Sequence, residues 1–228
     1  MVFDPIYMLI TFIAMGASMF VGSMLKRRFK EYSEIPMAMS GKEVAEKMLQ
    51  DNGIYDVQVI SVGGQLTDHY NPANKTVNLS EVVYHQRNVA AAAVAAHECG
   101  HAVQHAHSYT WLTLRSQLVP IVQISANWMQ WVLLAGIFLM SMGQSWLLLI
   151  GIMMFAFTTL FSIVTLPVEF DASNRALAWL NSSGVATSMQ HEKAKNALWW
   201  AAMTYFVAAL ASLGQLLYFI MIFMNARD

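Results

Sequence analysis

The sequence predicts a mainly α-helical, polytopic membrane protein with about four transmembrane helices and one small cytoplasmic α+β domain. The 228 residues are 57% hydrophobic and only 12% charged, whereas soluble domains carry about 25% charged residues. Several runs without charge are each long enough to cross a hydrocarbon core of about 30 Å. A polar section follows the first run and combines strand and helix patterns, so it forms the expected α+β domain.

The N-terminal residues 1–25 are predicted to form a transmembrane anchor. The apolar run from Ile6 to Leu25 follows Asp4 and precedes the basic residues of segment 26–30. A cleaved signal peptide has the opposite order of charges. We therefore expect an uncleaved anchor, with residue 26 and its successors in the cytoplasm.

Residues 26–115 form the predicted cytoplasmic region. Ser40 and Glu43 are spaced as a capping box, which opens a helix that ends near Asn52-Gly53. Three short strands are expected, at residues 57–62, 66–70 and 76–79. Ser80 is expected to cap a helix that continues to about His107. Two interpretations of the strands stay open: a sheet edge that holds an extended peptide by strand addition, and a purely structural hairpin.

The remaining chain is predicted to cross the membrane three more times. Residues 116–166 hold two spans, Val119 to Met142 and Trp146 to Leu166, joined by Gly143-Gln144-Ser145. Residues 167–197 return to the cytoplasm, and residues 198–228 form a C-terminal transmembrane helix. In this topology every Lys and Arg except Arg227 faces the cytoplasm, as the positive-inside rule requires.

The chemistry-bearing motif is His97-Glu98-Cys99-Gly100-His101, an H-E-x-x-H pattern. The Ala90–Ala93 run before it favours a helix, which places the two histidines one turn apart on one face. Two imidazoles in this geometry can bind one zinc ion, and Glu98 lies beside it as a proton acceptor. A chance match is the alternative, but the helical context favours a zinc site. Cys99 lies on another face, where a packing role is expected.

A catalytic zinc site needs a third protein ligand, and Glu169 is the predicted one. The expected topology places Glu169 on the same side of the membrane as the two histidines. His105 is a poorer candidate, because it lies about 12 Å from His97 along a straight helix. A solvated helix start is the alternative role for Glu169. Asp171 is expected to pair with Arg175 at i+4 or to support the zinc site.

These motifs carry a family resemblance. The segments His97–Gln104 and Pro167–Ser173 resemble the YugP-type neutral zinc metallopeptidases of bacterial membranes, and the similarity runs nearly the full chain. More distantly the layout is similar to the HtpX and CAAX-prenyl membrane gluzincins. In those proteins an aspartate four residues after the glutamate ligand orients a histidine, and Ser173 occupies that position here. The resemblance implies a membrane-embedded zinc protease of the bacterial cytoplasmic (inner) membrane, with no specific substrate.

The predicted function is therefore that of a zinc metalloendopeptidase, a hydrolase of protein or peptide substrates at the cytoplasmic membrane face. One Zn²⁺ per chain is held by His97, His101 and Glu169, and Glu98 is the general base for a zinc-activated water. The residues expected to support the ligands or to stabilise the oxyanion are Asp171, Arg175, His191, His69 and Tyr84. The expected partners are the lipid bilayer and the substrate. The net charge of −1 gives binding of nucleic acid no electrostatic support.

Two alternative functions stay open at this stage. An intramembrane-cleaving metalloprotease carries the same motif within a transmembrane helix, but His85 and His107 make the ends of this helix too polar for a comfortable span. A non-catalytic zinc-binding membrane adaptor needs no general base, so the presence of Glu98 argues against it.

Overall fold

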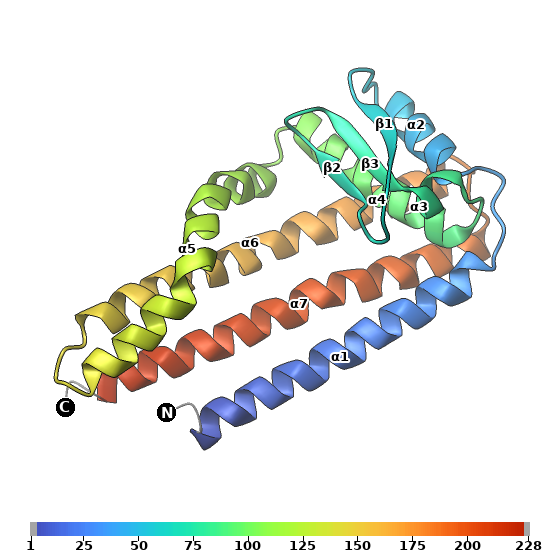
Figure 1. Ribbon diagram of the computed structural model, residues 1–228. Coiled ribbons are helices and arrows are strands. Elements are labelled where there is room, and N and C mark those ends of the chain that lie inside the picture. Colours follow the sequence, from blue (N-terminus) through green and yellow to red (C-terminus); the bar gives the residue numbers. More distant parts are fainter. Residues whose placement is uncertain (1–3, 226–228) are drawn as a thin grey trace. The chain divides into compact units, whose positions relative to one another are not determined.

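The computed structural model describes residues 4–225. The chain divides into two compact units, one of residues 1–20, 114–166 and 204–228, the other of residues 21–113 and 167–203. We call them the apolar unit and the motif unit. The predicted mainly helical class is confirmed, together with four candidate membrane-spanning helices and a small sheet (Figure 1).

The four candidate spans are long helices that by length and composition can cross a membrane. Their bounds are α1 Pro5–Ser33, α5 Thr110–Met140, α6 Trp146–Ser182 and α7 Ser188–Asn225. Within the apolar unit, Gly136 of α5 lies so close to α6 that an added Cβ would be 2.6 Å from Leu148 Cα. Thr159 of α6 and Ser212 of α7 share a hydrogen bond of 2.6 Å. Small and hydroxyl side chains thus form contacts between these helices.

The motif unit begins with helix α2, Gly41–Asp51, and its predicted capping box is confirmed. The backbone N–H of Glu43 donates to Ser40 Oγ at 3.3 Å, and the N–H of Ser40 donates to Glu43 Oε2 at 2.7 Å. Two N–H groups that a helix start leaves without partners are satisfied in this way. The apolar face of α2 enters the core through Val44 and Met48.

A three-stranded sheet follows, with β1 at Gln58–Val62, β2 at His69–Asn71 and β3 at Thr76–Ser80. The strand order is β1-β3-β2; β3 is parallel to β1 and antiparallel to β2. The expected strand at 66–70 is wrong in its first half, because Leu66 adopts a φ of 58° that no extended strand accommodates. Strand β2 is therefore short and lies at the edge of the sheet.

The expected single helix from Ser80 to His107 is wrong, because two helices occupy this segment. Helix α3 covers Glu81–His85 and helix α4 covers Val89–Ala106. Between them the backbone is extended and pairs with residues 35–37: the N–H of Met37 donates to Arg87 O, and that of Val89 to Ile35 O. Asn88, not Ser80, caps the motif helix, since its Oδ1 accepts from Ala91 N at 2.8 Å.

Helix α4 is the buried centre of the motif unit, and residues of α1, α2, β3, α6 and α7 pack around it in one core. Its alanine run is almost wholly inaccessible. Small residues allow neighbouring backbones to come close, and the closest approach is at Gly100. A Cβ at Gly100 would lie 2.4 Å from the carbonyl oxygen of Ala172 in α6. Glycine is thus required at this position for α4 and α6 to touch.

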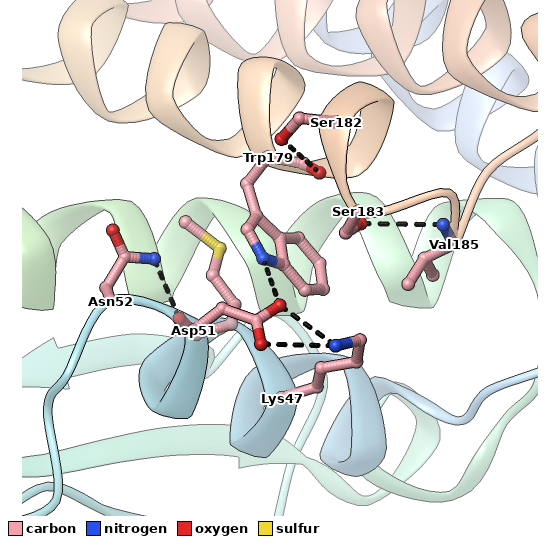
Figure 2. A network of polar contacts seen from close by, with 8 residues as sticks. Lys47, Asp51, Asn52, Trp179, Ser182, Ser183 and Val185 are labelled. Carbon is pink, nitrogen blue, oxygen red and sulfur yellow. Dashed lines mark hydrogen bonds and ion pairs between the residues drawn. The ribbon is translucent and has the colours of Figure 1, made fainter.

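The C-terminal part of α6 is tied to α2 by a polar network. The indole N–H of Trp179 donates to Asp51 Oδ2 at 2.9 Å, and Lys47 forms an ion pair with the same carboxylate at 3.0 Å (Figure 2). Helix α6 runs without interruption through Pro167 to Ser182. The segment after Pro167 is therefore helical and firmly packed, and it brings its acidic residues to α4.

Candidate metal centre

His97 and His101 lie one turn apart on the same face of α4. Their ring centroids are 4.8 Å apart and the ring planes are nearly perpendicular, at 82°. His101 is buried and His97 is partly buried. The i,i+4 spacing on a regular helix produces this arrangement, as the H-E-x-x-H pattern predicts.

Glu169 reaches the two histidines from α6. Its Oε2 lies 3.3 Å from His97 Nε2 and 3.7 Å from His101 Nε2. The candidate ligand atoms of the three residues all lie within 4.8 Å of one another. Tetrahedral zinc with bonds of about 2.1 Å places its ligand atoms about 3.4 Å apart. The donor set and the spacing both fit a zinc ion, and we call these residues the His-His-Glu group.

Contacts within the group keep the carboxyl group of Glu169 ionised. Burial alone raises the pKa of Glu169, but contacts with His101 and His97 outweigh it and hold that pKa well below its usual range. Burial lowers the pKa of His101, yet contact with Glu169 and the charge of Glu98 raise it overall. At neutral pH the group therefore presents an ionised carboxylate, the form that binds a metal.

Glu98 points from α4 towards the edge of the sheet. Its Oε2 accepts a hydrogen bond of 3.0 Å from the backbone N–H of Tyr70 in β2, and only 9% of the residue is exposed. The edge strand thus holds the carboxylate that follows the first histidine of the motif. A fixed carboxylate next to a metal can act as a general base.

Two polar residues contact the histidine rings on the side away from Glu169. Ser173 Oγ lies 3.1 Å from His97 Nδ1, and Gln104 Oε1 lies 3.0 Å from His101 Nδ1. Each partner contacts the ring nitrogen that faces away from Glu169. The signal for Gln104 was its spacing of three residues from His101, which places both on one side of a helix.

The other residues that were expected to support the site make the following contacts. Arg175 Nε donates to Asp171 Oδ2 at 2.6 Å, so the expected i+4 pair is present. In the described part of the chain, His191 contacts Glu192, and no contact joins it to the His-His-Glu group. His69 contacts Thr67 O. Tyr84 lies beside Lys42, and His105, the poorer ligand candidate, contacts Tyr70.

Cys99 lies outside the metal group. It is fully buried, with Sγ directed at Ala45 O at 3.5 Å, and burial raises the pKa of its thiol. A protonated, inaccessible thiol is neither a nucleophile nor a ligand. This position agrees with the packing role expected from the sequence.

The chain was found to match a protein family along most of its length. The family model described as "Putative neutral zinc metallopeptidase" matches residues 7–224. The chain belongs to this family. A curated relative, "Putative membrane protease YugP" of Bacillus subtilis (strain 168), is 40% identical over 225 residues, which are 98% of this chain and 99% of the relative. No solved structure matches the chain. The predicted resemblance is confirmed.

Membership of this family agrees with the composition and the fold. A zinc metallopeptidase family implies zinc as the cofactor, and the His-His-Glu group supplies a donor set that fits it. The four long apolar helices agree with the membrane location in the relative's name. The protein is thus a membrane member of a zinc metallopeptidase family.

Proposed function

We propose that the chain is a zinc metalloendopeptidase of the gluzincin type that hydrolyses protein substrates at the cytoplasmic face of the bacterial inner membrane. The observation that carries this proposal is the convergence of His97 Nε2, His101 Nε2 and Glu169 Oε2 at 3.3 and 3.7 Å. Two histidines and a glutamate would hold a zinc ion with the three protein ligands typical of catalytic sites, and the family is one of zinc metallopeptidases.

Each residue of the proposed site has a distinct role in hydrolysis. A zinc ion held by His97, His101 and Glu169 would supply Lewis acidity towards a peptide carbonyl and a water. Glu98 takes the proton from the attacking water and returns it to the leaving amine. The N–H of Tyr70 holds the Glu98 carboxylate in the site. Arg175 and His191 remain candidates for the stabilisation of developing charge.

The edge strand β2 is the proposed binding site for the substrate backbone. It is the outermost strand on one side of the sheet, and its residue Tyr70 touches Glu98. An extended peptide added to this edge would pass directly beside the proposed general base. This supports strand addition over a purely structural hairpin.

The cytoplasmic placement of the site rests on charge and on hydropathy. Residues 26–115 and 167–197, which hold the whole His-His-Glu group, carry nearly all the Lys and Arg of the chain. Helix α4 is not one of the four candidate spans among residues 4–225. Cleavage beside the membrane is therefore favoured over cleavage inside the bilayer core.

The experiment compares the wild type with Glu98→Gln, purified in detergent. We expect one zinc per chain in both proteins. Hydrolysis of an unfolded model protein should fall by a factor of about 10²–10⁴ in the variant, because the amide cannot accept the proton. Metal analysis and a gel-based cleavage assay measure the two quantities.

The matched control is Glu46→Gln, which changes an exposed glutamate of α2 that pairs with Lys42. It should keep full activity and full zinc content. A Glu98→Gln protein that cleaves as fast as the wild type would remove Glu98 from the mechanism. A wild type that holds no zinc after supplementation would refute the proposed function.

A further inference from the structure

Gln104 is a fully buried glutamine that joins the two helices of the His-His-Glu group. It lies on α4, three residues after His101, with no exposed surface. Its Nε2 donates to the carbonyl oxygen of Val168 and to Asp171 Oδ2, both at 2.8 Å, and its Oε1 lies 3.0 Å from His101 Nδ1. A buried amide with this many partners is held in a single orientation.

The two partners on α6 decide which end of the amide faces His101. The carbonyl oxygen of Val168 can only accept a hydrogen bond, and Asp171 Oδ2, which also accepts from Arg175, lies at the same end of the amide. The NH₂ end of Gln104 must therefore face α6, and its oxygen must face His101. An oxygen at 3.0 Å requires a hydrogen on Nδ1, so in the neutral ring the lone pair is on Nε2, the nitrogen nearer Glu169.

His97 lacks this constraint. Its Nδ1 partner is Ser173, whose hydroxyl can either donate or accept. A serine alone therefore does not select one tautomer of His97. Of the two histidines, His101 is the one whose protonation pattern is set by its surroundings before any metal arrives.

Gln104 also positions the third ligand. Val168, whose carbonyl it binds, directly precedes Glu169 in α6. The contact lies beside the close approach of Gly100 and Ala172. The same side chain thus orients one ligand from α4 and holds the backbone that carries another. The distance between His101 and Glu169 depends on both.

We propose that Gln104 is a positioning residue of the metal centre, which holds His101 in the Nδ1–H tautomer and holds Glu169 at ligand distance. This inference rests on the proposed zinc site. The proposal predicts that in the metal-free protein the lone pair of the neutral His101 ring is already on Nε2, the atom that would bind the metal. Outer contacts of this kind are commonly worth a factor of 10–100 in metal affinity.

The first test replaces the amide by a thioether of similar length, in Gln104→Met. We expect zinc affinity, measured by competition with a chelator, to fall by a factor of about 10–100. The absorption spectrum of the Co²⁺ form should also change, because the ligand geometry changes. The control is Gln190→Met, since Gln190 makes its polar contacts with Pro36 and Thr187. It should bind zinc as the wild type does.

The second test needs no variant at this position, so a folding defect of Gln104→Met cannot obscure it. The ¹⁵N spectrum of metal-free, histidine-labelled wild type, recorded where imidazole is neutral, reports the tautomer of His101. A His101→Gln spectrum identifies the resonance. We expect the hydrogen on Nδ1. A hydrogen on Nε2 would overturn the inference.

The outcomes separate this inference from the proposed function. If the wild type binds zinc and Gln104→Met binds it within twofold as tightly, the positioning role of Gln104 is refuted and the zinc site stands. If the wild type binds no zinc, the proposed function fails, together with the part of the inference that concerns metal affinity.

Discussion

At the scale of single residues, the sequence predicts those site residues whose contacts are local. His97 and His101 were predictable, because a helix fixes the geometry of an i,i+4 pair. Glu169 was predicted from topology, and the structure brings it to the two histidines. The contacts of Ser173 with His97 and of Gln104 with Val168 were not predicted, since they join α4 to α6. Spacing along one helix carries no information on such a contact.

Glu169→Gln tests the third ligand. The amide keeps the size of the side chain but removes the charge that the two histidines stabilise. We expect a loss of zinc affinity at least as large as the factor of about 10–100 for an outer contact. Chelator competition measures it. Glu192→Gln, on the exposed surface of α7, serves as control. Equal affinity of Glu169→Gln and wild type would exclude Glu169 as a ligand.

At the scale of elements, the sequence predicted helices and strands where capping and alternation are strong. The capping box at Ser40 and the antiparallel pair of β2 and β3 are examples. The prediction of one continuous helix was wrong at the break between α3 and α4, because the extended residues there pair with the distant segment 35–37. Long-range backbone hydrogen bonds override local helix propensity, and a short stretch of sequence does not predict them.

Gly100→Ala tests the contact between α4 and α6. The added methyl group would meet the carbonyl of Ala172 at 2.4 Å, one turn from Glu169. We expect a loss of about 1–3 kcal/mol in stability, as for other overpacked sites. The gain in helix propensity of up to about 1 kcal/mol is smaller. Zinc affinity should fall as well. Chemical denaturation and chelator competition measure the two effects.

Gly22→Ala is the matched control for this substitution. Gly22 also lies in a helix of the motif unit, but a Cβ there would meet no atom within 4 Å. The control should be as stable as the wild type or slightly more stable. If Gly100→Ala behaved like Gly22→Ala, the close approach of the two helices would not be needed for the metal centre.

At the scale of the whole molecule, hydropathy predicted the four candidate spans, because a helix that crosses a bilayer core needs about 20 consecutive apolar residues. The ends of the helices were less predictable. Helix α6 extends through Pro167 and α1 extends to Ser33, well beyond the apolar runs. The distribution of Lys and Arg supports the proposed orientation of the loops.

Labelling of an introduced cysteine tests the topology. We expect a membrane-impermeant maleimide to modify Ser141→Cys in intact cells, and Ser108→Cys only after permeabilisation. Both serines are exposed in the structure. Wild type is the control, because its buried Cys99 should not react in the folded protein. Labelling of Ser108→Cys in intact cells would contradict a cytoplasmic site.

The three residues of the His-His-Glu group are separated in the sequence by two candidate membrane spans. His97 and His101 precede residues 116–166, and Glu169 follows them. During biosynthesis the ribosome therefore completes the motif helix long before the last donor emerges. A stalled or truncated chain holds only two of the three donors. Completion of the group is thus tied to synthesis of α5 and the first part of α6, two of the four candidate membrane spans.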